Sequence, residues 1–367
     1  MSVSKIVITG GPCGGKTTAL SRIQRDLSHL GYTVLTVPET ATALISGGVA
    51  PWTCATNVEY QKCQMLMQMQ KEQVFQRAAA TMPDEKIVIV CDRGELDNKA
   101  YMSDEEFSEV LDFLGKTEIE LRDDYDAVFH LVTAAKGAEE FYTLENNAAR
   151  YESVEEAAEL DDKFIAAWTG HPHFRVIDNR SDFEAKMRHL MREITYFLGD
   201  LAPYEIERKF LIEYPSVEWL ESLPNCERVE IVQTYLRSEP DLEIRIRQRG
   251  TEGNYIYYLT EKRITSNRVR MELQRRLTER EYLTLLTQAD PTFRQIEKTR
   301  YCLTYAGQYF EIDLFPCWDD QAMVEIELTQ EDTEVHFPPE LRVIREVTGN
   351  PDYRNAVIAS KPRGATH

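Results

Sequence analysis

The sequence predicts two domains of different fold class, an α/β domain built on a parallel sheet and then an α+β domain built on an antiparallel sheet. In the first half, short apolar runs alternate with helical segments, which is typical of a parallel sheet with helices on both faces. After Leu201-Ala-Pro203, one strand-like segment follows another, as in an antiparallel sheet or barrel. We therefore expect one domain over residues 1–200 and another over 201–367.

Each element of the first half follows from a local pattern. The third expected strand, Lys86–Cys91, is a nearly continuous apolar run, as in a strand covered on both faces. The last expected helix, Asp182–Leu198, ends at Gly199, a common helix stop. Ligands bind at the carboxyl ends of parallel strands, so the polar residues there form the candidate site. The other expected strands are Lys5–Thr9, Thr33–Val37, Tyr125–Val132 and Phe174–Ile177, and the other expected helices are Thr17–Leu30, Asn57–Ala80, 104–114 and 152–168.

Eight consecutive strands are expected in the second half. One helix interrupts them and opens with the capping box Thr278-Glu-Arg-Glu281. Another helix is expected from Pro339. A series of short strands of this kind predicts an antiparallel sheet or barrel. The expected strands are 204–212, 229–237, 242–249, 254–263, 267–274, 295–304, 308–315 and 323–329.

The loop after the first strand fits the phosphate-binding pattern G-x-x-x-x-G-K-[ST]. Its glycines allow backbone N–H groups to turn inward around phosphate oxygens, and the helix that follows points the positive end of its dipole at the same anion. Lys16 would reach the terminal phosphates and Thr17 would hold Mg²⁺. The candidate nucleotide-binding residues of the loop are Gly10, Gly11, Pro12, Cys13, Gly14, Gly15, Lys16, Thr17 and Thr18.

Three charged residues beyond the loop are candidates for catalysis. Asp92 follows the third strand and would support Mg²⁺, with a helix N-cap as the ordinary alternative. Glu39 follows the second strand and would act as a base or hold an acceptor hydroxyl, unless it merely caps a helix. Arg150 would close over the transferred phosphate as arginine fingers do, unless it is a solvated helical residue.

Charged residues alternate with apolar residues along the strands of the second half. On any single strand, the ordinary reading is an amphipathic strand with its charges in solvent. Acids gather on the first, seventh and eighth strands, however, and bases gather mainly on the third and sixth. This division suits an interior in which bases bind a polyphosphate and carboxylates hold Mg²⁺ or Mn²⁺.

The first half resembles the NadR/TRP-translocation-defect branch of P-loop nucleotide kinases. The matching motifs are residues 10–18, Val37-Pro-Glu-Thr40, Cys91-Asp-Arg-Gly94 with Asp97 and Tyr101, Asn146 with Arg150, and Val176-Ile-Asp-Asn179. The resemblance covers essentially all of 5–199 and implies binding of ATP or GTP with Mg²⁺. It also makes Asp178 and Asn179 candidates for contact with the base.

The second half is similar to the CYTH, or triphosphate tunnel metalloenzyme, family over nearly all of 204–360. The motifs include Glu205-Ile-Glu-Arg-Lys209, the ExExK signature. The family implies an eight-stranded antiparallel tunnel that binds a triphosphate with divalent metal. The fifth strand departs from the family, because Glu272-Leu-Gln274 lacks one of two alternating acids. By matching positions, the residues facing metal would be Glu205, Glu207, Asp313, Glu325 and Glu327, and those facing phosphate would be Lys209, Arg245, Arg247, Lys262, Lys298 and Arg300.

The amino-acid composition limits the kinds of binding partner that we expect for this protein. The net charge is −20, and both halves are acidic, with 20 basic and 33 acidic residues in 1–200. Binding of nucleic acid through bulk electrostatics is therefore not expected. The seven cysteines include no C-x-x-C pair, which favours a reducing cytoplasm and no zinc site. The sequence contains no run of about 18 apolar residues, so we expect no transmembrane segment.

We therefore expect a cytoplasmic, purine-nucleotide-binding P-loop protein with NTPase or phosphotransferase chemistry at Lys16, Asp92, Glu39 and Arg150. The order of its two domains resembles the TRP translocation defect proteins, which implies GTP binding and association with phosphorylated lipid. Its tunnel would bind a second phosphorylated small molecule or a phospholipid headgroup. One alternative is a metal-dependent triphosphatase that acts in the tunnel. Another is a regulator without enzymatic activity, in which GTP gates the binding of a phospholipid or a protein partner.

Overall fold

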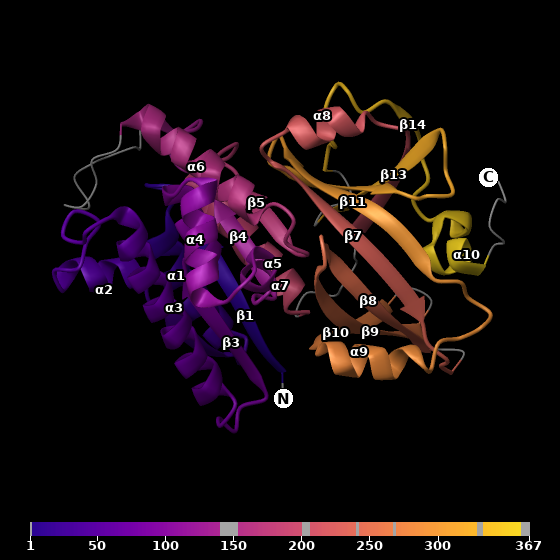
Figure 1. The fold of residues 1–367 in the computed structure, drawn as a ribbon, viewed down its shortest axis with the longest axis horizontal. Helices are drawn as coiled ribbons and strands as arrows, with labels where there is room; N and C mark the ends of the chain where they lie inside the picture. The colour runs from indigo at the N-terminus through magenta and orange to yellow at the C-terminus, as the bar shows by residue number, and fades with distance from the viewer. Residues whose placement is uncertain are drawn as a thin grey trace. The chain divides into compact units, whose positions relative to one another are not determined.

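The computed structural model describes residues 2–139, 153–199, 206–239, 242–266, 269–328 and 333–360. The chain divides into two compact units, Met1–Leu198 and Gly199–His367. Figure 1 shows a helix-covered sheet in the first and a curved sheet with few helices in the second. No helix of the described residues combines the length and apolar character that crossing a membrane requires.

The first unit contains a five-stranded parallel sheet, as predicted. Its strand order is β2-β3-β1-β4-β5, so the strand that leads into the phosphate loop lies in the centre. All five expected strands are confirmed, with ends that differ by a few residues. They are β1 (Ser2–Thr9), β2 (Thr33–Val37), β3 (Lys86–Asp92), β4 (Ala127–Leu131) and β5 (Phe174–Ile177).

The five expected helices of this unit are present, and three short elements were not predicted. The predicted helices are α1 (Lys16–His29), α3 (Asn57–Ala79), α4 (Asp104–Leu114), α6 (Val154–Trp168) and α7 (Phe183–Phe197). The additional elements are α2 (Thr40–Ser46), the 3₁₀ helix η1 (Glu95–Tyr101) and α5 (Glu118–Arg122). Each has seven residues or fewer, too few to show a helical period in the sequence.

The two faces of the parallel sheet differ in character. Ile6 and Ile8 of β1 pack with apolar residues of α1 and α7 in one buried cluster. Lys5 and Thr9, which alternate with them along the strand, are also buried but bond to polar groups of other elements. The polar face of α3 belongs to this second side, since Gln61, Gln64, Gln68 and Glu72 are all buried.

The second unit is a nine-stranded antiparallel sheet in the order β10-β9-β8-β7-β11-β12-β13-β6-β14. The eight predicted strands are confirmed as β6 (Ile206–Glu213), β7 (Cys226–Tyr235), β8 (Leu242–Thr251), β9 (Asn254–Ser266), β10 (Val269–Leu277), β11 (Ile296–Tyr305), β12 (Gln308–Leu314) and β13 (Gln321–Leu328). The helix with the predicted capping box is α9 (Glu279–Leu286). The short helix α8 (Val217–Ser222) was not predicted.

The prediction of a helix from Pro339 is wrong. That segment leads instead into β14 (Val343–Glu346), a ninth strand that pairs antiparallel with β6. The outer edge of β6 carries backbone groups that need hydrogen-bond partners, and this demand of the sheet outweighs a local helix preference. The end of the described chain forms the 3₁₀ helix η3 (Pro351–Tyr353) and α10 (Asn355–Ser360).

The apolar core of the second unit covers one face of the sheet. Phe210, Ile312 and Val324 lie on neighbouring strands and pack with Leu220 of α8. The charged residues lie on the opposite face, where Lys298, Arg300, Asp313 and Glu325 are all at most 7% exposed. The sheet curls so that this face becomes an interior (Figure 1). A second apolar cluster, which joins Tyr235, Ile296 and Met323 to α10, lies on the same face and occupies one end of it.

Candidate functional site

The loop between β1 and α1 passes very close to the end of β4. A Cβ atom on Gly10 would lie 2.1 Å from the carbonyl oxygen of Leu131, and one on Gly14 would lie 2.7 Å from the same oxygen. Gly10 and Gly15 also have positive φ angles of 138° and 91°. Cys13 has a φ of 57°, which places a non-glycine residue in the left-handed region. The pattern thus produces the tight turn that the glycines predicted.

Lys16 extends back over this loop. Its Nζ donates hydrogen bonds to the carbonyl oxygens of Gly10 at 2.8 Å and Gly11 at 2.9 Å. Burial, followed by the positive charge of Arg93, lowers the pKa of Lys16 to about 7. An anion beside the ammonium would oppose both effects, because it favours the charged form.

Arg93 joins the ends of β2 and β3. Its Nε lies 2.7 Å from Oε1 of Glu39, and the hydroxyl of Thr42 donates to Oε2 of Glu39 at 2.6 Å. Glu39 occupies the N-cap position of α2 but makes no capping bond through its side chain. Asp92 is the last residue of β3 rather than the N-cap of η1, which is Gly94. The N-cap alternative therefore does not describe Asp92, whereas Glu39 does occupy an N-cap position, without a capping bond from its side chain.

Asp92 and Glu39 influence each other electrostatically. Burial, and then the negative charge of Glu39, raises the pKa of Asp92. Burial also acts to raise the pKa of Glu39, but Arg93 outweighs it and the net shift is downward. A divalent cation near Asp92 would relieve this repulsion, so the residues present are compatible with Mg²⁺.

Two buried acids near the loop were not assigned by sequence reasoning. Asp97 accepts hydrogen bonds from the Thr9 hydroxyl at 2.6 Å and from the Trp168 indole at 2.7 Å. Asp161 accepts one from the backbone N–H of Gly11 at 2.9 Å. Asp97 belongs to the motif that begins at Cys91, whereas no motif indicated Asp161.

The residues predicted to contact the base lie after β5. The amide nitrogen of Asn179 donates to the carbonyl oxygens of Thr133 at 2.7 Å and Lys136 at 2.8 Å, and its amide oxygen accepts from Lys186. Asp178 accepts from the backbone N–H of Arg180 at 3.1 Å. Asn179 thus fixes the segment after β4. The predicted Arg150 lies outside the described residues.

The strand register of the second unit places the charged residues on one face. Arg300 is opposite Asp313, Glu325 is opposite Lys209, and Glu327 is opposite Glu207. The arginines of β8 lie opposite residues of β7, with Arg245 opposite Tyr235, Arg247 opposite Gln233 and Arg249 opposite Ile231. On the other side of β7, Ile231 is opposite Lys298 of β11. Residues that are directly opposite share a face of the sheet, so the predicted tunnel residues of the described chain are brought together.

The acidic side of this face already contains basic partners. Both oxygens of Asp313 accept hydrogen bonds from Arg300 at 2.7 Å, and Arg300 also reaches Glu325 at 2.8 Å and contacts Glu311. Lys298 contacts Asp313. Burial alone would lower the pKa of Arg300, but these carboxylates outweigh burial and raise it well above its usual value.

Lys209 bridges two further carboxylates on the same side. Its Nζ lies 2.5 Å from Glu325 and 3.1 Å from Glu207. Burial, and then the charge of Glu325, raises the pKa of Glu207. This remaining repulsion between carboxylates is compatible with a divalent cation. Glu205 and the side chain of Glu272 lie outside the part of the chain that is described.

The opposite side of the interior is rich in arginine. Burial, and then the charges of Arg245, Arg249 and Arg300, lowers the pKa of Arg247 to about 10. One guanidinium nitrogen of Arg247 donates to the Gln274 side-chain oxygen at 3.1 Å, while its buried Nε has no hydrogen-bond partner among the residues that the structure describes. Gln274, the departure noted in the sequence, thus contacts Arg247 without neutralising it. This concentration of positive charge suits an anion.

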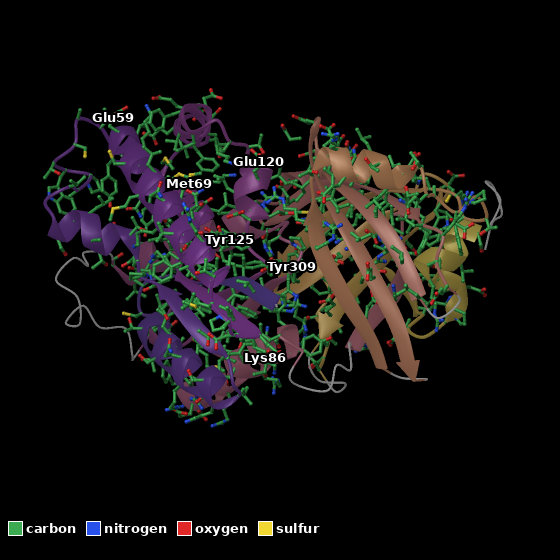
Figure 2. All side chains as sticks on the ribbon, turned by 90° about the horizontal axis from the view of Figure 1, so that it is seen from below. Glu59, Met69, Lys86, Glu120, Tyr125 and Tyr309 are labelled. Carbon is green, nitrogen blue, oxygen red and sulfur yellow. The ribbon has the colours of Figure 1, made fainter. Side chains whose placement is uncertain are left out.

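A third group of acids lies in the first unit, in the polar layer under α3. Oxygens of Glu72, Glu95 and Asp124 all lie within 4.8 Å of one another. Lys5 already contacts Glu72 at 3.0 Å and also Asp124. The hydroxyl of Tyr125, labelled in Figure 2, donates to Glu72 at 2.9 Å and accepts from the backbone N–H of Glu95 at 2.9 Å. None of the predicted metal-binding residues belongs to this group.

Parts of the chain are similar to known proteins. No curated protein matches the chain. The crystal structure of the inorganic triphosphatase NE1496 is 30% identical, with a TM-score of 0.32, over 44% of this chain and 97% of that one. The PH1012 protein from Pyrococcus horikoshii OT3 is 17% identical, with a TM-score of 0.25, over 33% of this chain and 78% of that one. Both TM-scores lie below 0.5, so neither likeness supports a conclusion about function. Residues 5–186, which include the phosphate loop, match a family model described as an AAA domain, and over this range the chain is similar to the AAA domain family.

Proposed function

We propose that the first unit binds a purine nucleoside triphosphate with Mg²⁺ at the loop Gly10–Thr18, and that it hydrolyses the nucleotide or transfers its terminal phosphoryl group. The observation that carries this proposal is the position of Lys16, a partly buried ammonium over a glycine-rich turn at the start of a helix. The match to the AAA domain family over residues 5–186 supports it.

Each residue of this site has a proposed role. Thr17 and Asp92 would hold Mg²⁺, which neutralises phosphate charge and orients the terminal group. Lys16 would bind the terminal phosphates, and Glu39, held by Arg93, would accept a proton from the attacking hydroxyl or water. Arg150 would close over the γ-phosphate, and Asp178 with Asn179 would lie beside the base.

For the second unit we propose that its charged interior binds another phosphorylated ligand with a divalent cation. Arg245, Arg247 and Lys262 would bind phosphate, together with Lys298, Arg300 and Lys209. Glu207, Asp313, Glu325 and Glu327, together with Glu205, would hold the cation. The buried Nε of Arg247, which has no hydrogen-bond partner among the described residues, supports the binding of an anion on this side. The same observation favours the second candidate function, a metal-dependent triphosphatase that acts in the interior.

The test is a thermal-shift and phosphate-release panel with Mg²⁺ and ATP, GTP or tripolyphosphate. A ligand that binds the folded state raises the melting temperature by mass action. We expect Lys16→Ala to reduce the shift by ATP and GTP strongly, without abolishing it, and to keep the shift by tripolyphosphate. The matched control is Arg25→Ala, because Arg25 is an exposed residue of the same helix.

The measurement of phosphate release distinguishes the two candidate functions. Turnover of nucleotide that is lost in Lys16→Ala supports chemistry at the loop. Turnover of tripolyphosphate that survives Lys16→Ala but is lost in Arg247→Ala supports the triphosphatase. If Lys16→Ala leaves nucleotide binding and turnover unchanged, the first proposal is wrong.

A further inference from the structure

Asp161 of α6 is a fully buried carboxylate that accepts hydrogen bonds from four groups. Its Oδ1 lies 2.9 Å from the backbone nitrogen of Gly11 and 3.1 Å from that of Thr133. His130 Nε2 lies 3.0 Å from Oδ1, and Lys136 Nζ lies 3.1 Å from Oδ2. Burial alone would raise the pKa of Asp161, but His130 and Lys136 outweigh burial and lower it. The carboxylate is therefore ionised at neutral pH.

The peptide unit between Gly10 and Gly11 is held from both ends. Its N–H, on Gly11, donates to Asp161, while its carbonyl oxygen, on Gly10, accepts from Lys16 at 2.8 Å. Because a peptide unit is planar and trans, its N–H and C=O point in opposite directions and rotate together. Asp161 therefore fixes the direction of the carbonyl group that Lys16 contacts.

The identity of residue 11 agrees with this arrangement. A Cβ atom on Gly11 would lie 2.8 Å from Oδ1 of Asp161 and 2.9 Å from Cβ of Thr133. The backbone of Gly11 lies outside the left-handed region, so its conformation alone does not require glycine. The close approach of Asp161 does.

We propose that Asp161 is a positioning residue of the phosphate loop and that it acts on Lys16 through the Gly10–Gly11 peptide. This inference rests on the proposed binding of nucleotide by the loop. A neutral side chain of similar shape would fill the same space without the cost of burying a charge. The charge strengthens the hydrogen bond to Gly11, because an ionised acceptor binds an N–H roughly twice as strongly as a neutral one.

The test measures the dissociation constant of Mg-ATP, or of Mg-GTP if only that nucleotide binds, by titration calorimetry of the full chain. Asp161→Asn keeps the shape of the side chain and removes its charge, and we expect binding to weaken about tenfold. The matched control is Asp162→Asn. Asp162 is the exposed neighbour that also pairs with Lys136, at 2.6 Å, and its change should leave the constant within about twofold.

A double-mutant cycle distinguishes this role from a purely structural one. If Asp161 acts through Lys16, the loss caused by Asp161→Asn should largely disappear in a Lys16→Ala background. An equal loss in both backgrounds, or wild-type affinity in Asp161→Asn, would overturn the inference. If Asp161→Asn does not fold, Gly11→Ala displaces the same peptide and should show the same dependence on Lys16.

Failure of the two proposals can be told apart. If the wild-type chain binds neither ATP nor GTP, the proposed function is wrong and this inference falls with it. If the wild type binds nucleotide and Lys16→Ala binds it more weakly, while Asp161→Asn binds as tightly as Asp162→Asn, only the role of Asp161 is wrong.

Discussion

Glu95 makes the stability of the first unit depend on pH. Burial, and then the charge of Glu72, raises the pKa of Glu95 from 4.5 to about 8. Between these values the folded protein holds a proton that the unfolded chain has lost, so the free energy of unfolding falls as pH rises. We expect denaturant titrations to show a lower stability at pH 8 than at pH 5 and a weaker pH dependence in Glu95→Gln.

The control for this experiment is Glu85→Gln, which changes an exposed carboxyl before β3. It should keep the pH dependence of the wild type. A Glu95→Gln variant with the same slope as the wild type would show that Glu95 does not carry the effect.

At the scale of elements, strands β11, β12 and β13 are joined by one guanidinium. Arg300 contacts Asp313, Glu311 and Glu325, and it is 7% exposed. Arg300→Met would leave three carboxylates without this partner, and breaking a buried ion pair costs about 3–5 kcal/mol. We expect a loss of this size in the free energy of unfolding of the second unit, measured by denaturant titration.

Arg275→Met on β10 is the comparison, since Arg275 is 56% exposed and lies 3.4 Å from Glu281. An exposed pair of this kind contributes about 0–1 kcal/mol, so this variant should remain close to the wild type. Equal losses in the two variants would contradict a special role for the buried network.

At the scale of the whole molecule, the first unit includes α7 in its core. Met187, Leu190 and Ile194 of that helix pack with Ile6 and Ile8 of the central strand. We expect a fragment of residues 1–199 to unfold cooperatively on heating, because it keeps the complete core. A fragment of residues 1–180 removes α7 and exposes this cluster, so it should lack a cooperative transition in circular dichroism. Two fragments with the same transition would contradict this assignment of α7.

The sequence was most informative where a pattern repeats over several residues. The strands of both sheets were found because each shows alternation or an apolar run. The glycine-rich loop was found because its chemistry needs glycines at fixed spacing. The short helical elements α2, η1, α5 and α8 were missed because each has seven residues or fewer. Strand β14 was missed because it depends on an edge supplied by β6.

By itself, the sequence determined the two fold classes and the location of the glycine-rich loop, because these follow from local periodicity and spacing. It also sorted the charges of the second half by strand. Only the tertiary structure decided that this charged face is enclosed, because burial depends on how the sheet curls and on which face α8 covers. It alone brought Asp161 to Gly11, 150 positions apart in the chain, since no local pattern encodes a contact over that separation.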